Sequence, residues 1–201
     1  MSQENVAILH GLPEPEQLRV NLYRLLARLL ALPPDRELLD MLSALSGDDT
    51  DLGAAIGDLS AAAQALSENE AREEYHDLFI GVGRGELVPF GSYYLTGFLN
   101  EKPLARLRDD MAPLGIARSP DAKEPEDHVG ALMDMMAGLI DGSFGQCRPL
   151  ETQKAFFKKH IGSWAAHFFA DLEKAPSAHL FRPVGAIGGR FLEIEEAGFD
   201  M

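Results

Sequence analysis

The sequence contains a single cysteine, Cys147, among 201 residues. A disulfide within the chain and a thiolate-bound structural metal are both excluded, because each needs at least two cysteines. Long apolar runs are also missing, since Arg19, Arg24 and Arg28 interrupt the leucine-rich stretch near the start. The first five residues hold no basic side chain, so neither a signal peptide nor a membrane span is expected there. We therefore expect a cytoplasmic protein.

Basic residues are scarce relative to acidic ones. The chain has 18 Lys+Arg against 32 Asp+Glu, which gives a formal net charge of -14. A field of this sign repels nucleic acid and anionic lipid and attracts cationic groups. Nucleic-acid binding and stable membrane insertion are therefore not expected. The charge fits a cationic partner but does not identify one, because acidity also serves solubility.

Alternating apolar and polar residues, which would indicate strands, are absent from the sequence, whereas apolar residues recur at helical spacing almost throughout. The composition, with 46% hydrophobic and 25% charged residues, is that of a globular chain. We predict an all-α protein, a single-domain bundle of about seven to nine helices covering residues 1–201. The predicted helical segments are approximately 14–31, 37–45, 50–66, 67–79, 104–114, 125–140, 157–172 and 180–194.

Local signals fix several helix ends. Pro33 and Pro34 should stop the first helix, whose apolar stripe is Leu18, Leu22, Leu25, Leu26 and Leu29. Ser67 and Glu70 have the spacing of a capping box, so a helix should begin there and reach Phe79. Pro125 is tolerated at the first position of a helix, and Glu126 and Asp127 would then face the positive end of its dipole.

Two pairs of residues have the spacing of metal ligands. Glu73 and His76 form a Glu-x-x-His pair of the kind seen in di-iron bundles, which need a second such pair and two further glutamates. The other candidate histidine, His128, has Pro125 three residues before it, and proline cannot coordinate a metal. His160 and His167 would share one helical face, with Asp171 four residues further on. We interpret the histidines as amphipathic residues packed beside aromatics such as Trp164, and we expect no metal or other cofactor.

The segment Gly81–Gly85 reads Gly-Val-Gly-Arg-Gly, which suggests a loop that could hold a phosphate. A P-loop would continue into Gly-Lys-Ser/Thr and a helix, and a dinucleotide fold would need a preceding strand. Neither accompanies this segment. A flexible glycine loop is the simpler interpretation, and a nucleotide-binding or nucleotide-hydrolysing protein is the alternative.

Residues 124–128 read Glu-Pro-Glu-Asp-His. A carboxylate, an imidazole and the free N–H groups of a helix start could together recognise cationic or peptide groups of a partner. From chemistry alone, a helix N-terminus capped by Asp127 is the favoured interpretation. No nucleophile lies in a recognisable catalytic context, and we expect that the chain is not an enzyme.

Four blocks in this order resemble a known family. They are residues 74–81 (EYHDLFIG), 88–95 (VPFGSYYL), 124–128 (EPEDH) and 156–164 (FFKKHIGSW). Together they are similar to the TorD/DmsD/NarJ family of redox-enzyme maturation chaperones, and the resemblance covers nearly the whole chain.

The resemblance implies an all-α chaperone that binds the twin-arginine signal peptide of a molybdenum-cofactor enzyme precursor and holds the precursor until the cofactor is inserted. Some members have been linked to GTP, which would suit the nucleotide alternative at Gly81–Gly85. The client enzyme stays open, as does the choice between monomer and homodimer. The implied peptide-binding residues are Tyr75, Leu78, Phe79, Pro89, Phe90, Tyr94, Pro125, Asp127 and His128.

Overall fold

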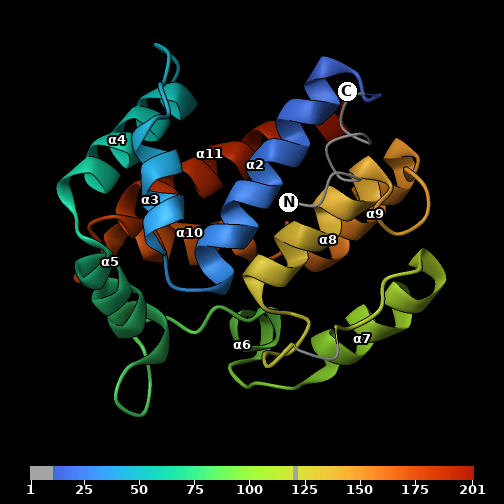
Figure 1. The fold of residues 1–201 in the computed structure, drawn as a ribbon. Coiled ribbons are helices and arrows are strands. Elements are labelled where there is room, and N and C mark those ends of the chain that lie inside the picture. The colour runs from blue at the N-terminus through green and yellow to red at the C-terminus, as the bar shows by residue number, and fades with distance from the viewer. Residues whose placement is uncertain (1–10, 120–121) are drawn as a thin grey trace. The chain divides into compact units, whose positions relative to one another are not determined.

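The computed structural model describes residues 11–119 and 122–201, and these residues are helical without a β-strand among them (Figure 1). The prediction of an all-α protein is confirmed. Ten α-helices lie in the described residues, nine of them seven residues or longer, against the seven to nine predicted. The contacts cluster into two compact units, of which unit 1 holds residues 11–31 and 90–164 and unit 2 holds residues 32–89 and 165–201. A single domain over 1–201 stays a prediction.

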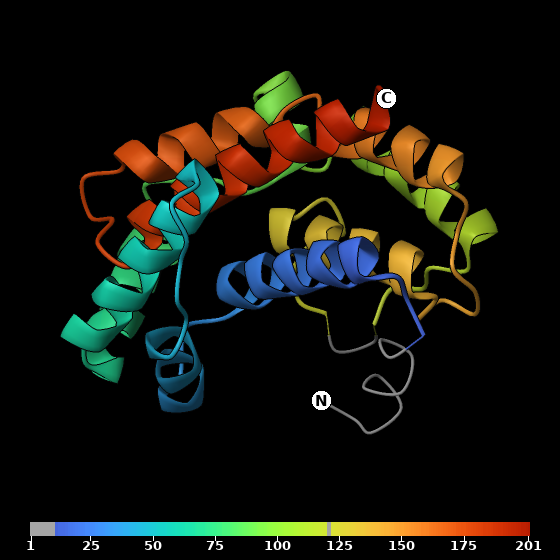
Figure 2. The same cartoon turned by 90° about the horizontal axis from the view of Figure 1, so that it is seen from above.

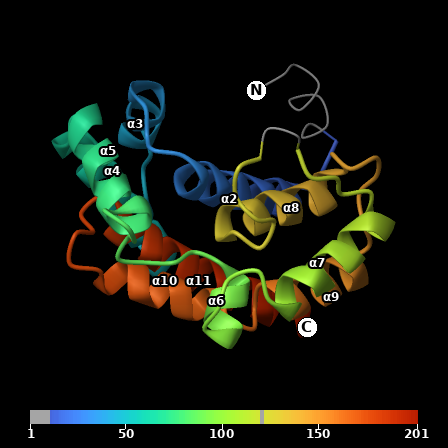
Figure 3. The same cartoon turned by 90° about the horizontal axis from the view of Figure 1, so that it is seen from below.

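Unit 1 is built around two helices that lie side by side, α2 and α8 (Figures 1 and 3). Its elements are α2 (Glu14–Ala31), α6 (Gly91–Thr96), α7 (Lys102–Met111), a 3₁₀ turn (Ala112–Leu114), α8 (Val129–Asp141) and α9 (Leu150–His160). Helix α8 is buried on almost every side, which its near-continuous run of apolar residues explains. On the rim, Arg24 of α2 pairs with Asp134 and Asp141 of α8, and its Nη2 lies 3.0 Å from Asp141 Oδ2.

The start and end of α2 match the prediction, but its buried face is rotated from the predicted stripe. Leu18 is exposed, whereas Val20 and Tyr23 are fully buried together with Leu26 and Leu29. Val20 and Tyr23 belong to the same helical face as Ala27 and Leu30, and this face packs inward. The spacing of the leucines therefore predicted the helix correctly but placed its buried face on the wrong side.

Unit 2 is formed by three packed helix pairs: α10 with α11, α11 with α4, and α3 with α4 (Figure 2 shows α10 and α11 side by side). Its elements are α3 (Arg36–Ser43), α4 (Asp51–Ala65), α5 (Glu68–Tyr75), the π-helix η1 (His76–Ile80), α10 (Ala165–Lys174) and α11 (Phe181–Phe199). Ser60 Oγ of α4 donates to the carbonyl oxygen of Ser43 over 3.0 Å and ties α4 to the end of α3. The predicted capping box is confirmed, since Ser67 and Glu70 exchange hydrogen bonds at the start of α5.

One predicted helix is divided in the structure, and one helix was not predicted. Residues 157–172 are not one helix, because α9 ends at His160 and α10 begins at Ala165. Gly162 and Ser163, which are poor helix formers, lie in this break, and the indole N–H of Trp164 donates to the carbonyl oxygen of His160 over 2.7 Å. Helix α6 was missed altogether, because its six residues are too few to show a helical period.

Candidate functional site

The nine predicted peptide-binding residues fall into two groups. Tyr75, Leu78, Phe79 and Pro89 belong to unit 2, and Phe90, Tyr94, Pro125, Asp127 and His128 belong to unit 1. Within each unit the residues of a group come from blocks that are separate in sequence.

The group in unit 2 is centred on three aromatic rings. Tyr75 closes α5 and Phe79 lies in the π-helix, and their ring centroids are 4.9 Å apart in an edge-to-face arrangement. Phe181, the first residue of α11, contacts both rings at 5.9 and 5.4 Å. Leu78 is fully buried beside them and Phe79 is half-buried. Sequence reasoning missed Phe181, since nothing near it in the chain belongs to the motif.

Glu74 fixes the start of α11 against this group. Its buried carboxylate accepts hydrogen bonds from the backbone N–H groups of His179, Leu180 and Phe181, at 2.8, 3.0 and 2.8 Å. Carboxylates are favourable at a helix N-terminus, where the N–H groups have no partner within the helix and the dipole is positive. Glu74 therefore positions Phe181 beside its own neighbour, Tyr75. One signal in the sequence could have indicated this role: Glu74 is the first residue of the first motif block.

The loop Gly81–Gly85 follows the π-helix directly. Gly81 has a φ of 61°, and a Cβ added there would lie 2.1 Å from the carbonyl oxygen of Arg84, so only glycine fits. The loop continues into irregular backbone up to Phe90, and no helix N-terminus follows it in this described stretch. The arrangement of a phosphate-binding loop, which joins a strand to a helix, is therefore not found at Gly81–Gly85.

In unit 1, the segment before α8 departs from the prediction. Pro125 is not the first residue of the helix, which begins at Val129 with His128 as its N-cap. Pro125 instead opens a tight turn, in which the N–H of His128 donates to the carbonyl oxygen of Pro125 over 3.1 Å. Glu126 and Asp127 are the two corner residues of this turn, so the helix begins four residues later than the predicted start at Pro125.

His128 caps α8 with its ring. Nδ1 accepts a hydrogen bond from the N–H of Gly130 over 3.1 Å, so the neutral ring carries its proton on Nε2. Burial lowers the pKa of His128 to about 4, because the low-dielectric surroundings disfavour the charged ring. The ring packs edge-to-face on Phe90 at 5.1 Å, and the backbones of the two residues form an isolated antiparallel bridge.

Asp127 holds the first turn of α6. Its carboxylate Oδ2 accepts from the N–H of Ser92 over 2.7 Å, and its carbonyl oxygen accepts from the N–H of Gly91 over 2.9 Å. Asp127 is 2% exposed and His128 is 6% exposed, so both side chains are turned into the protein. Asp127 Oδ1 and the hydroxyl of Ser92 are also buried, and neither has a hydrogen-bond partner among the described residues.

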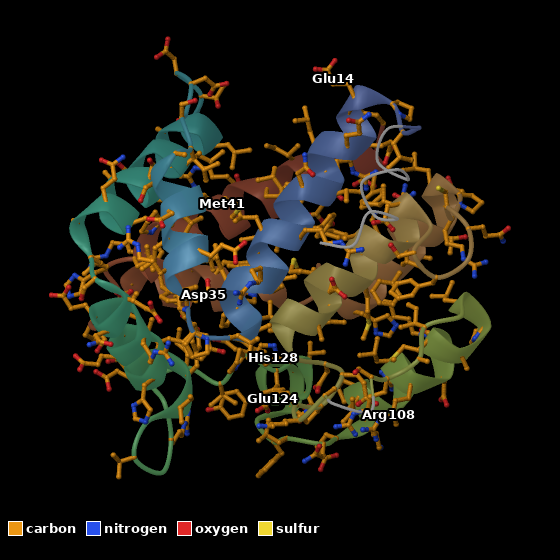
Figure 4. All side chains as sticks on the ribbon, in the orientation of Figure 1. Glu14, Asp35, Met41, Arg108, Glu124 and His128 are labelled. Carbon is orange, nitrogen blue, oxygen red and sulfur yellow. The ribbon has the colours of Figure 1, made fainter. Side chains whose placement is uncertain are left out.

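An ion pair also holds this segment in place. Arg108 of α7 holds both carboxylate oxygens of Glu126, with Nη2 2.7 Å from Oε2 (Figure 4 labels Arg108, Glu124 and His128). Burial tends to raise the pKa of Glu126, but the hydrogen bonds from Arg108 outweigh it and the pKa is lowered. The Glu-Pro-Glu-Asp-His block is thus anchored to α6, α7 and α8 by three successive side chains.

The predicted shared face of His160 and His167 is wrong, because the break after His160 separates them. His160 Nε2 lies 2.7 Å from Asp110 Oδ2 of α7, and Lys159 Nζ lies 2.5 Å from the same oxygen. Trp164, beside His160, packs on Tyr94 with a centroid distance of 5.4 Å. His167 is exposed on α10. The interpretation of His160 as a residue packed beside aromatics is therefore supported.

Neither a metal centre nor a membrane-spanning helix is found in the described residues. No cluster of three or more His, Cys, Asp or Glu side chains is placed to hold a metal ion across residues 11–119 and 122–201. Glu73 and His76 are exposed, and His76 Nδ1 lies 3.5 Å from Asp77 instead. Among the same residues, every helix is too short or too polar to cross a bilayer.

The two units differ strongly in charge. The sequence of Met1–Ala31 and Phe90–Trp164 contains 13 acidic and 12 basic residues, a net charge of -1. The sequence of Leu32–Pro89 and Ala165–Met201 contains 19 acidic and 6 basic residues, a net charge of -13. Within unit 2, Glu73 and Asp77 are exposed on the same helical stretch that supplies Tyr75 and Phe79. Nearly all of the net negative charge of the sequence therefore belongs to unit 2, which should attract cations more strongly than unit 1.

Comparison with known proteins identifies relatives of this chain. The family model described as nitrate reductase delta subunit matches residues 46–170. The chaperone protein TorD of Vibrio cholerae is 28% identical over 138 residues, which are 65% of this chain and 63% of that protein. A protein of Haemophilus influenzae named as a Tat proofreading chaperone, DmsD, is 31% identical over 117 residues, or 57% of this chain and 55% of that protein. The matched part thus spans less than two thirds of the length of these relatives.

A crystal structure of a redox enzyme maturation protein from Archaeoglobus fulgidus has the same fold, with a TM-score of 0.60 at 19% identity over 88% of this chain and 94% of that one. The family model covers more than half of the chain and includes all nine predicted peptide-binding residues. This family is one of chaperones and not of catalysts, in agreement with the prediction that the chain is not an enzyme. The chain belongs to the nitrate reductase delta subunit family, the TorD/DmsD/NarJ group of redox-enzyme maturation chaperones that its motif blocks predicted.

Proposed function

We propose that this chain is a cytoplasmic chaperone that binds the twin-arginine leader of a molybdoenzyme precursor and retains the precursor until its cofactor is inserted. The observation that carries the proposal is the family match over residues 46–170, which contains every motif block from 74 to 128. The relatives named TorD and DmsD support the same role.

The charge of the chain supports a leader as the client. A twin-arginine leader has a cationic beginning followed by an apolar stretch, and a net charge of -14 attracts the cationic part. Because unit 2 carries -13 of this charge, the arginines should be drawn to unit 2, where Glu73 and Asp77 are exposed. These two carboxylates alternate with Tyr75 and Phe79 along the chain.

The motif residues contribute in two ways under this proposal. Phe79, Phe90, Tyr94 and Pro125 are partly exposed and can contact a peptide directly. The other five motif residues are buried and would support the four partly exposed ones; they are Tyr75, Leu78, Pro89, Asp127 and His128.

The test is a titration of the full-length protein with synthetic leader peptides, followed by fluorescence anisotropy. The first peptide carries Arg-Arg and an apolar stretch, the second has Gln-Gln in place of Arg-Arg, and the third keeps Arg-Arg but has serines in the apolar stretch. We expect the first to bind most tightly, with an affinity that weakens as salt rises because exposed charges are screened. Equal binding of all three peptides would rule out a leader-binding role.

A further inference from the structure

The end of α6 and the turn after it expose an unusual amount of apolar surface. Leu95, Phe98 and Leu99 are 44%, 70% and 47% exposed, and we call these three residues the apolar turn. They lie within five residues of one another in unit 1. Single exposed leucines are ordinary, but an exposed phenylalanine with an exposed leucine on each side of it in the chain marks an interaction surface.

The backbone holds this turn in one conformation. Helix α6 ends at Gly97, whose N–H donates to the carbonyl oxygen of Tyr93 over 2.7 Å. Thr96 Oγ1 donates to the carbonyl oxygen of Ser92 over 2.8 Å and accepts from the N–H of Phe98 over 3.2 Å. Phe98 is therefore presented to solvent by a hydrogen-bonded turn, and less conformational entropy is lost when a partner covers it.

At its other end, α6 is fixed by the family motif. The N–H groups of Gly91 and Ser92 both donate to Asp127, and Phe90 just before them packs on His128. Asp127 itself is buried and cannot reach a partner without rearrangement. Its carboxylate thus acts on the surface of unit 1 through α6, the helix that carries the apolar turn.

The chemistry of the turn selects its partner. Residues 91–100 contain no charged side chain, and they lie in the unit whose net charge is -1. A surface without charge complements an uncharged apolar segment, whereas the cationic part of a leader is matched by the charge of unit 2. A second copy of this chain fits poorly, because two copies that each carry -14 repel one another.

We propose that the apolar turn binds the apolar stretch of the client's leader, and that Asp127 is the positioning residue that holds α6 for this contact. The inference rests on the proposed function and adds to it the surface that covers the apolar half of the leader. Neither Leu95, Phe98 nor Leu99 belongs to the nine motif residues, so the claim can be tested separately from the motif.

The test uses Phe98→Ser and Leu99→Ser, with Leu150→Ser as the matched control. Leu150 is 50% exposed in the same unit, on α9, so its replacement removes a similar area of apolar surface elsewhere. Each variant is titrated with two peptides, one with Arg-Arg and about 10 leucine and alanine residues, the other with serines replacing those leucines. Melting temperatures confirm that the variants are folded.

We expect Phe98→Ser to weaken binding of the leucine peptide by about 10- to 100-fold, since a buried phenylalanine contributes about 1.5 to 3 kcal/mol. Leu99→Ser should have a smaller effect, and Leu150→Ser none. The serine peptide should bind all variants alike. For Asp127, the Asp127→Asn substitution should weaken binding in the parent but not in the Phe98→Ser background, a coupling that a loss of overall stability would not produce.

Three outcomes would overturn the inference. If the parent binds neither peptide, the proposed function falls with it. If the parent binds the leucine peptide but Phe98→Ser binds it equally well, the leader docks elsewhere and only this inference fails. If the parent forms a concentration-dependent dimer that Phe98→Ser abolishes, the apolar turn is a self-association surface.

Discussion

Unit 1 and unit 2 each place one buried carboxylate of a motif block at the start of a helix, but the two carboxylates are satisfied to different extents. In unit 2, Glu74 accepts three backbone N–H groups of the α11 terminus. In unit 1, Asp127 accepts one N–H through Oδ2, while its Oδ1 has no partner among the described residues. Three hydrogen bonds therefore hold the start of α11 in unit 2, whereas a single side-chain hydrogen bond holds the start of α6 in unit 1. We call each of these contacts between a buried carboxylate and a helix start a joint.

The charges of the two units follow the same division. Unit 2 carries -13 and unit 1 carries -1, because unit 1 has fewer acidic residues, 13 against 19, and twice as many basic ones, 12 against 6. In unit 1 those bases are paired locally, as Arg108 is with Glu126 and Arg24 with Asp134 and Asp141. Under the proposed function, this comparison suggests that unit 2 attracts the cationic end of a client, whereas the short α6 of unit 1 presents apolar surface.

The largest expected effect is on the joint in unit 2. Glu74→Ala would leave three backbone N–H groups at a buried helix terminus without an acceptor, and it should lower the free energy of unfolding by about 3 to 5 kcal/mol. Asp127→Ala removes the acceptor of a single side-chain hydrogen bond and should lower it by about 1 to 2 kcal/mol. Urea denaturation measures both values.

Glu73→Ala is the matched control, because Glu73 is the exposed neighbour of Glu74 on the same helix. Its effect should stay within about 0.5 kcal/mol. A loss for Glu74→Ala no larger than that for Asp127→Ala would remove the difference between the two joints.

The second effect concerns pH and unit 1. The pKa of His128 is about 4 in the folded chain and near 6.5 when unfolded, so its contribution to stability is complete above pH 6.5 and is lost as the pH falls toward 4. In that window only the unfolded chain takes up the proton, which lowers the free energy of unfolding by about 3 kcal/mol. His160, whose pKa burial also lowers against the pull of Asp110, adds a loss of the same sign.

The His128→Asn substitution keeps an acceptor for the N–H of Gly130 and removes the titration. We expect the variant to be less stable at pH 7, where the ring contact with Phe90 is lost, but to show a shallower decline of stability from pH 6.5 to 4.5. Unfolding curves collected at steps across this range give the slope. An unchanged slope would mean that His128 does not titrate as a buried ring.

The two joints also separate what could be predicted from the sequence from what could not. The all-helical class, the ends of α2 and the Ser67 capping box all depend on residues within one or two turns, and each was predicted correctly. The hydrogen bonds of Glu74 to α11 join residues 105 to 107 positions apart, and that of Asp127 to Ser92 joins residues 35 apart. Neither periodicity nor capping rules reach across such separations.

Residues 124–128 show why the local structure of a motif block could not be read from its residues alone. From chemistry alone, the Glu-Pro-Glu-Asp-His block was interpreted as a helix start capped by Asp127, but the N-cap of α8 is His128 and Asp127 accepts from the N–H of Ser92 instead. Glu126, Asp127 and His128 all turn into the protein. The spacing of Pro125 to Asp127 suits a turn before a helix as well as a helix start, and only the burial of three consecutive side chains decides between them. The role of these residues in leader binding stays a prediction.

A smaller effect tests the charge difference between the units. The double variant Glu73→Gln/Asp77→Gln removes two exposed carboxylates from unit 2, and Glu124→Gln/Glu151→Gln removes two from unit 1. Under the proposed division, the first should slow association with an Arg-Arg leader peptide by about 2- to 5-fold at low salt, while the second should leave the rate nearly unchanged. Stopped-flow rates at two salt concentrations measure this, and the difference should vanish near 1 M salt, where screening acts within about 3 Å. Equal slowing by both pairs would show that only the total charge matters.

The smallest effect compares two buried serines, one from each unit. Ser60 of unit 2 donates its hydroxyl to the carbonyl oxygen of Ser43 over 3.0 Å, so Ser60→Ala should lower the free energy of unfolding by about 1 kcal/mol. Ser92 of unit 1 is fully buried, and its hydroxyl has no partner among the described residues. Removing a buried hydroxyl that makes no hydrogen bond also removes its desolvation penalty, so Ser92→Ala should be neutral or stabilising by up to about 1 kcal/mol. Parallel urea titrations of both variants give the comparison. A loss at Ser92 as large as that at Ser60 would mean that the hydroxyl is paired in solution, and unit 1 would then be as well satisfied around α6 as unit 2 is around α11.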